Sequence, residues 1–240
     1  MRPHRPHFPF DPRSPQVPGP TGHTLALAAQ TVIETELTPA MRNHSIRSLL
    51  FARAAAADRG IRAGADYDEE IVYLICALHD IGLSEIADGD QRFEVDGADY
   101  AAEFLESQGM TDERVDIIWD ASAAHTTGLS GSPVYRRRRP AAIWVAVDGI
   151  AIDIGGNAGM LSRGYADRVH TDYPRLGGIR ALTRLVEAQA VANPAKAQPG
   201  SLPGEIVRLT HPELVPTWQD IIAADGWGDQ RATGDRPAGA

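Results

Sequence analysis

Histidine and aspartate side chains stand near the ends of several helices that the sequence predicts. The stretch LICALHDIGLSEI, residues 74–86, places His79 and Asp80 after an apolar helical run and shortly before a glycine. His125 and Asp153 also stand two or three residues before a glycine. Glycine often ends a helix, and the carbonyl end of a helix carries partial negative charge that favours a cation. If these helix ends converge, a divalent metal ion is a natural occupant.

A further predicted helix carries His44, so that the candidate side chains are spread over four helices. Two imidazoles and two carboxylates form a mixed nitrogen and oxygen ligand set that suits zinc, iron, manganese or nickel. Such a metal lowers the pKa of a coordinated water and so provides a nucleophile near neutral pH. Coordination also explains how charged groups survive in an apolar helix, where burial of an unpaired carboxylate is costly.

Each of these residues has a purely structural alternative. A lone histidine on an apolar helix is more often a hydrogen-bonded core residue, and Asp80 alone suits an ion pair with a surface arginine. Asp148 competes with Asp153 for the last ligand position, because side chains five residues apart point in different directions on a helix. Only the combination across four helices favours a metal site over separate core residues.

This combination resembles the HD-domain superfamily of metal-dependent hydrolases, whose pattern is H…HD…D on a helical bundle. It resembles most closely the cyanamide hydratase-like branch. The similar stretches, within residues 41–156, are MRNHSIRS, ALHDIGL, RFEVDGADYAA, WDASAAHTTG and VDGIAIDIGG. The resemblance implies His44, His79, Asp80 and Asp153 as metal ligands. Asp153 takes the last place because its position before IGG matches the branch.

The resemblance also implies one metal ion rather than two. Binuclear members carry an additional histidine shortly before the glycine that opens the helix after HD, whereas Phe93 and Glu94 stand here. We interpret Glu94 and Asp96 as acids of a helix N-terminus. His125 corresponds to a pocket histidine, and the sequence leaves open whether it is a ligand or an outer acid or base. Zinc is the expected metal, with iron, manganese and nickel as alternatives.

Four side chains are expected to act on the substrate. Asp80 and His125 are the predicted catalytic residues, since either could shuttle a proton. Arg47 lies three residues after His44 on the same helix face, where it could hold an anion or orient Asp80, or simply be solvated. Thr126 could line the pocket, or it could cap the helix end.

The elements that must position these residues are predicted to be helices, because apolar residues recur with helical spacing and no segment alternates with a period of two for long. Asn43 is a candidate N-cap for the second helix. Residues 194–215 are interrupted by proline and glycine. The fold is therefore predicted to be all-α, a single helical bundle of the HD-domain type. The expected helices cover residues 24–38, 43–59, 66–81, 96–109, 111–128, 140–156, 177–193 and 216–226.

Both ends of the chain are predicted to be disordered tails. Residues 1–22 are rich in proline at a spacing of about three, which suits an extended segment, and residues 228–240 show no apolar periodicity. A partner-binding role for the proline-rich segment is the alternative. The helical domain is expected to cover residues 23–227.

Composition limits the class of protein. The chain has 240 residues and a formal net charge of −9, which disfavours a nucleic-acid binder. Its single cysteine, Cys76, cannot form an internal disulfide, which fits a reducing compartment. No apolar run is long enough to span a bilayer. We expect a cytoplasmic protein without a membrane or nucleic-acid partner, and a homo-oligomer is compatible with the sequence.

The expected function is that of an enzyme acting on a small molecule. The first hypothesis is a metal-dependent hydrolase or hydro-lyase that adds water to a nitrile-like or C=N group, similar to cyanamide hydratase. The second is an HD-type phosphohydrolase acting on a nucleotide or another phosphate ester, which needs basic residues around the metal. The third is a non-catalytic module in which the histidines and aspartates are core residues.

Overall fold

Helices dominate the fold. The computed structural model describes residues 24–155 and 158–226, and within these ranges it contains eleven α-helices and no β-strand. The all-α prediction is confirmed. The predicted tails, residues 1–22 and 228–240, lie outside the described residues, as do residues 23 and 227 at the two ends of the predicted domain. The domain limits therefore stay a prediction. The helices are Thr24–Glu36 (α1), Pro39–Asp58 (α2), Glu69–Leu78 (α3), Phe93–Ser107 (α4), Arg114–Ala124 (α5), Pro133–Arg138 (α6), Ala141–Gly155 (α7), Tyr165–Asp172 (α8), Ile179–Ala192 (α9), Leu202–Thr210 (α10) and Trp218–Ala223 (α11).

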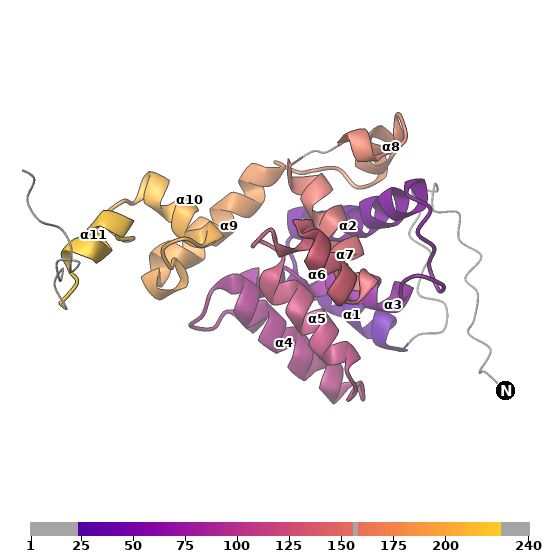
Figure 1. Cartoon of the computed structure of the whole chain (residues 1–240), viewed down its shortest axis with the longest axis horizontal. Coiled ribbons are helices and arrows are strands. Elements are labelled where there is room, and N and C mark those ends of the chain that lie inside the picture. The colour runs from indigo at the N-terminus through magenta and orange to yellow at the C-terminus, as the bar shows by residue number, and fades with distance from the viewer. Residues whose placement is uncertain (1–23, 156–157, 227–240) are drawn as a thin grey trace, which may run out of the picture.

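The helices α1 to α5 and α7 share one hydrophobic core, with α2 and α7 crossing inside it (Figure 1). Gly149 of α7 makes this crossing possible. A Cβ atom at Gly149 would lie 2.2 Å from the carbonyl oxygen of Ser48 and 2.6 Å from the Cβ of Ala52. The absence of a side chain therefore lets α7 pack directly on the backbone of α2, which brings the C-terminal half of α7 close to the first half of α2.

A second close approach follows directly after the His79–Asp80 pair. The short 3-10 turn Ile81–Leu83 passes under the start of α4, and a Cβ at Gly82 would lie 2.0 Å from the carbonyl oxygen of Phe93. The facing residue on α4 is also a glycine, Gly97, whose added Cβ would lie 2.8 Å from the Gly82 nitrogen. This contact explains why α3 ends at the His–Asp pair: the chain must turn to pack its backbone against α4.

The helices α9 to α11 form an arm that extends away from the bundle (Figure 1). The arm is tied to the bundle near the turn that follows His79 and Asp80. Gln189 of α9 donates a hydrogen bond to the carbonyl oxygen of Gly82 at 2.8 Å. Lys196, which is only 2% exposed, forms ion pairs with Asp88 at 2.5 Å and Asp96 at 2.8 Å. A buried lysine with two carboxylate partners fixes the arm to the first turn of α4.

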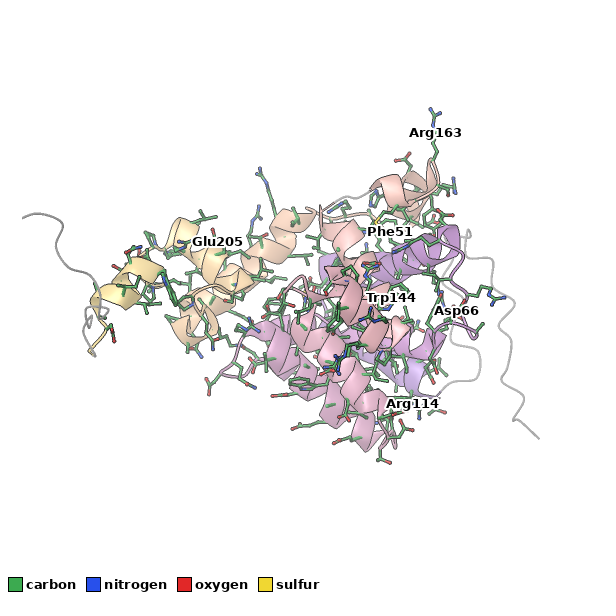
Figure 2. The ribbon with its side chains drawn as sticks, in the orientation of Figure 1. Phe51, Asp66, Arg114, Trp144, Arg163 and Glu205 are labelled. Atoms are coloured by element: carbon green, nitrogen blue, oxygen red, sulfur yellow. The ribbon has the colours of Figure 1, made fainter. Side chains whose placement is uncertain are left out.

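A smaller apolar cluster joins α8 to the outer face of α2. Phe51, labelled in Figure 2, packs edge to face against Tyr165 with ring centroids 6.4 Å apart and against His170 at 5.8 Å. The Tyr165 hydroxyl also donates to the carbonyl oxygen of Leu50 at 3.3 Å. The helix α8 was not predicted, because five of its eight residues are charged or polar and its apolar pattern is short.

Several predicted helix limits are wrong. The helix α2 begins at Pro39 rather than Asn43, since Thr38 is its N-cap and accepts a hydrogen bond from the Met41 nitrogen. Asn43 instead donates its side-chain amide to the carbonyl oxygen of Pro174. The helix α4 begins at Phe93, three residues before the predicted start.

The helices α6 and α10 were not predicted, the second because residues 194–215 are interrupted by proline and glycine. The helices α6 and α10 each have proline at one of their first two positions and a serine N-cap, Ser132 or Ser201. Proline at the first turn of a helix costs little, because the N–H groups there have no partner within the helix. A serine followed by such a proline is therefore a start signal rather than a break.

The packing at Gly149 yields a stability prediction. Gly149→Ala should lower the free energy of unfolding by about 1–3 kcal/mol, because the new methyl group meets backbone atoms of α2 that cannot move away. Gly155→Ala in the same helix is the control: a Cβ there meets nothing within 4 Å, and we expect a change within about 0.5 kcal/mol. Urea denaturation measures both. Equal stabilities of the two variants would contradict the proposed close packing.

Candidate metal centre

His79 is fixed at the C-terminal end of α3. Asp68 caps the start of this buried helix by accepting hydrogen bonds from the backbone nitrogens of Glu70 and Ile71. The helix ends at Leu78, and the Nδ1 atom of His79 lies 3.0 Å from the carbonyl oxygen of Cys76. Because a carbonyl only accepts, Nδ1 carries the proton and donates. The lone pair is thereby assigned to Nε2, which faces the interior.

His125 is held at the end of α5 by the same local arrangement. The helix ends at Ala124, and His125 Nδ1 lies 2.6 Å from the carbonyl oxygen of Ser122, three residues earlier. Its Nε2 atom is therefore the free nitrogen, and it lies 3.5 Å from Oδ1 of Asp80. Two helices thus present a histidine to the same carboxylate from their carbonyl ends.

His44 comes from the interior of α2 rather than from a helix end. Its Nδ1 atom lies 2.7 Å from Oδ2 of Asp153 and donates to this carboxylate. Its Nε2 atom lies 3.2 Å from Nε2 of His79 and 3.5 Å from Oδ2 of Asp80. As at the other two histidines, the hydrogen-bond partner of Nδ1 leaves Nε2 free.

The resulting cluster fits a divalent metal ion. His79 Nε2 lies 3.3 Å from Asp80 Oδ2, and ligand atoms of His44, His79 and Asp80 all lie within 4.8 Å of one another. The two histidine nitrogens that face each other at 3.2 Å both carry lone pairs when the rings are neutral, and a metal ion or a second proton on one ring relieves their repulsion. These three residues could therefore hold a metal, with two nitrogen ligands and one oxygen ligand.

Exposure differs between the two sides of the cluster. The side chains of His44 and His79 are 1% and 0% exposed, whereas those of Asp80 and His125 are 8% and 6% exposed. The small exposed part of the cluster is therefore on the side of Asp80 and His125, where α5 ends and α4 begins. A catalytic metal site keeps a coordination position open toward such a side.

Burial and the close charges shift the pKa values within the cluster. Burial lowers the pKa of His79, which favours the neutral imidazole that a metal requires. Burial alone would raise the pKa of Asp80, but the charges and hydrogen bonds of His79 and His125 hold it well below its usual range. Burial also lowers the pKa of His125, but the hydrogen bond to Asp80, the charge of Asp80 and the bond to Ser122 together outweigh this effect and leave the pKa raised. Asp80 is therefore ionised at neutral pH.

Asp153 lies on the far side of His44 from the cluster. Arg47 binds its carboxylate with two parallel hydrogen bonds, Nε to Oδ1 at 2.8 Å and Nη2 to Oδ2 at 2.7 Å. Burial would raise the pKa of Asp153, but these bonds and that from His44 lower it. In this arrangement Asp153 orients His44, and it does not belong to the three-residue group whose ligand atoms converge. Its predicted role as a direct ligand remains a prediction.

Arg47 is only 2% exposed, and its guanidinium is fully engaged within the protein. Besides its two bonds to Asp153, its Nη1 donates to the carbonyl oxygens of Tyr173 and Pro174, both at 3.2 Å. Arg47 is thus not a solvated arginine, and it contacts Asp153 rather than Asp80. These contacts lend no support to the predicted substrate role of Arg47, which stays a prediction.

Asp148, the alternative to Asp153, faces away from the cluster. Its carboxylate pairs with Arg59 at 2.8 Å and with Arg136 at 2.6 Å. Asp153 therefore occupies the position near His44 that the resemblance assigned to it.

Thr126 and Glu94 form a pair beside His125 that the sequence did not reveal. The Thr126 hydroxyl donates to Oε1 of Glu94 at 2.6 Å. Glu94 lies in the first turn of α4, as predicted for a helix N-terminal acid, but it is fully buried rather than solvated. The motif RFEVDGADYAA carried the resemblance, yet one sequence could not show that its glutamate points inward. Thr126 contacts Glu94, and its substrate role stays a prediction.

Comparisons with known proteins agree with this geometry. The family model described as HD domain matches residues 41–155, which contain His44, His79, Asp80, His125 and Asp153. No curated protein matches the chain. HD domains are generally metal-dependent hydrolases that bind divalent metals, and the matched segment contains the group of His44, His79 and Asp80 that could hold one. Among the described residues, no helix is long and apolar enough to cross a membrane.

His79 belongs to the converging group and Asp153 lies outside it, and this difference predicts how each residue affects metal affinity. His79→Ala should abolish binding of zinc, because it removes a converging nitrogen. Asp153→Asn should weaken binding roughly 10- to 100-fold and still reach one equivalent at saturation, because it only loosens the partner of His44. Metal titration of variants whose folding is checked by circular dichroism measures this, with the exposed His211→Ala as control. Complete loss of binding in Asp153→Asn would instead make Asp153 a direct ligand.

Proposed function

We propose that this chain is a metal-dependent hydratase or hydrolase that adds water to a small, uncharged substrate with a nitrile-like or C=N group, as in the conversion of cyanamide to urea. The observation that carries the proposal is the convergence of three Nε2 atoms on Asp80, with each Nδ1 bound elsewhere. A divalent metal held by His44, His79 and Asp80, with zinc as the first candidate, would supply a water of lowered pKa and positive charge to polarise the substrate.

The residues on the exposed side of the cluster have the chemistry that such a reaction needs. Hydration of a nitrile forms one bond between the water oxygen and carbon and moves protons from oxygen to nitrogen. Nε2 of His125 faces Asp80 at 3.5 Å and can pass a proton between the water and the substrate nitrogen. Asp80 balances the charge of the imidazolium that forms. His125 is thereby proposed as the proton-transfer residue, whereas His44 and His79 are proposed as ligands.

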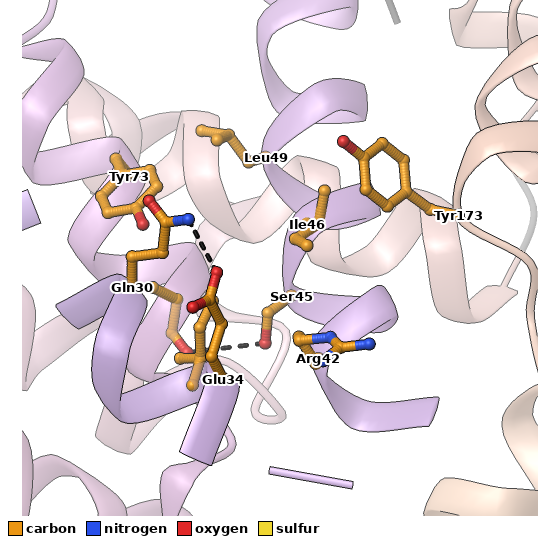
Figure 3. Close-up of a pocket in the computed structure, with 10 residues that line it drawn as sticks. Gln30, Glu34, Arg42, Ser45, Ile46, Leu49, Tyr73 and Tyr173 are labelled. Atoms are coloured by element: carbon orange, nitrogen blue, oxygen red, sulfur yellow. Dashed lines mark hydrogen bonds between the residues drawn. The ribbon is translucent and has the colours of Figure 1, made fainter. Parts of the chain in front are cut away.

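An uncharged substrate is favoured over a phosphate ester because two arginines near the motifs, Arg47 and Arg42, do not face the metal cluster. Arg47 binds Asp153. Arg42 lines a separate cavity of about 240 Å³ between α1, α2 and α3, together with Glu34, Tyr73 and other side chains (Figure 3), and the residues of the metal cluster do not line it. A phosphate ester needs several free cationic groups around the metal. The carboxylates of Asp80 and Glu94 would repel it.

The proposal predicts a metal-dependent release of urea. Protein loaded with zinc should convert cyanamide to urea, and treatment with a chelator followed by fresh zinc should abolish and restore the activity. His125→Gln should retain zinc and lose roughly 10²- to 10⁴-fold in kcat, because it removes the proton-transfer group. Urea release and zinc content are measured on the same preparations. Hydrolysis of nucleotides without any release of urea would instead support the phosphohydrolase alternative.

A further inference from the structure

Glu94 has a carboxylate oxygen for which the structure shows no partner. The residue is 0% exposed. Its Oε1 atom accepts the hydrogen bond from Thr126, but Oε2 has no hydrogen-bond partner although it is buried. Buried polar atoms are nearly always paired, and a lone carboxylate oxygen away from water is costly. Such an atom calls for a partner that the folded chain itself does not supply.

Glu94 lies beside His125, on the less buried side of the cluster. Thr126, which donates to Oε1 of Glu94, follows His125 in sequence. The ring of Phe93, the residue before Glu94, packs against the ring of His125 with centroids 5.8 Å apart. Glu94 therefore flanks His125, and His125 and Asp80 are the residues of the cluster that reach solvent.

The position of Glu94 is fixed by its surroundings on α4. Two residues further along the same helix, Asp96 is held by Lys196 and by the backbone nitrogens of Gly89 and Gln91. The carbonyl oxygen of Phe93 lies against Gly82. The start of α4 is thus anchored on two sides, and the hydroxyl of Thr126 selects the orientation of the carboxylate. A preorganised acceptor of this kind is typical of a specificity contact.

We propose that Oε2 of Glu94 accepts a hydrogen bond from an N–H group of the substrate, and so selects small substrates that carry N–H next to the reacting carbon. This inference rests on the proposed function and names the substrate class within it. A carboxylate accepts and cannot donate, so it favours an amino, amide or amidine group and rejects anions. A second metal is a weaker explanation, because Glu94 is not among the residues whose ligand atoms converge.

Two pairs of matched probes test the role of Glu94. Cyanamide and dimethylcyanamide share the nitrile but differ in N–H groups, and acetamide and N,N-dimethylacetamide differ in the same way without being nitriles. The zinc-loaded protein should hydrate cyanamide with a kcat/KM roughly 10- to 100-fold above that of dimethylcyanamide, the effect expected for one hydrogen bond to a charged group. Ligand-observed NMR should show the same preference in binding for acetamide.

Glu94→Gln is the decisive variant, because it keeps the shape of the side chain and can turn a donor toward the substrate. The variant should retain one equivalent of zinc and lose the discrimination between both probe pairs. Its melting temperature should stay the same or rise, because a buried and half-paired charge is removed. Glu103→Gln, an exposed residue of the same helix, should change none of these values.

The outcomes separate this inference from the proposed function. If cyanamide is not hydrated but the binding preference for acetamide exists and disappears in Glu94→Gln, the specificity contact stands and the reaction assigned to the site is wrong. The inference is overturned if wild type binds both amides equally or neither, or if Glu94→Gln keeps the discrimination. Loss of zinc in Glu94→Gln would also overturn it, since Glu94 would then be a metal ligand.

Discussion

The structure depends on one electrostatic constraint, which is that three histidine side chains meet at one buried carboxylate. His44 and His79 place their Nε2 atoms 3.2 Å apart, and His125 approaches Asp80 from a third helix. Neutral rings of His44 and His79 would place two lone pairs face to face, which a metal ion or a second proton on one ring relieves. Each Nδ1 is bound by an acceptor, so the rings cannot relieve the repulsion by exchanging their two nitrogens. The arrangement could therefore hold a divalent metal ion, and the apolar core surrounds it.

Glycines make this convergence possible. The helices α2 and α7 cross at Gly149, and the turn after His79 and Asp80 packs against α4 through Gly82 and Gly97. At both places backbone meets backbone, which brings helices closer together than side chains would allow. The site thus depends on small residues that take no part in the chemistry, and an insertion of a single methyl group would displace a histidine or its partner.

Much of the site follows from the sequence because its signals are local. Helical spacing and a following glycine placed His79, His125 and Asp153 near helix ends, and the convergence of these ends followed from the resemblance to HD domains. Other features depend on pairs of residues that are distant in sequence. The bonds from Arg47 to Asp153 join positions 106 residues apart, and the Thr126–Glu94 pair joins positions 32 apart. No periodicity reveals such pairs. The helix starts at Thr38 and Ser201 carry a local signal, an N-cap residue followed by proline in the first turn. Proline is also typical of interruptions, and helix starts are therefore not predicted there from the sequence.

The buried ion pairs of Lys196 bear on what constitutes a folding unit in this chain. The segment that matches the HD family ends at residue 155, yet Asp96 inside it has its cationic partner on the arm beyond that limit. The carbonyl of Gly82 likewise accepts its bond from Gln189. A protein cut back to the matched segment would leave a buried carboxylate without its counter-charge next to the turn that carries the histidine and aspartate. The segment that matches the family model is thus smaller than the unit that folds together. The arm lies outside the matched segment, yet it supplies partners for polar groups inside it.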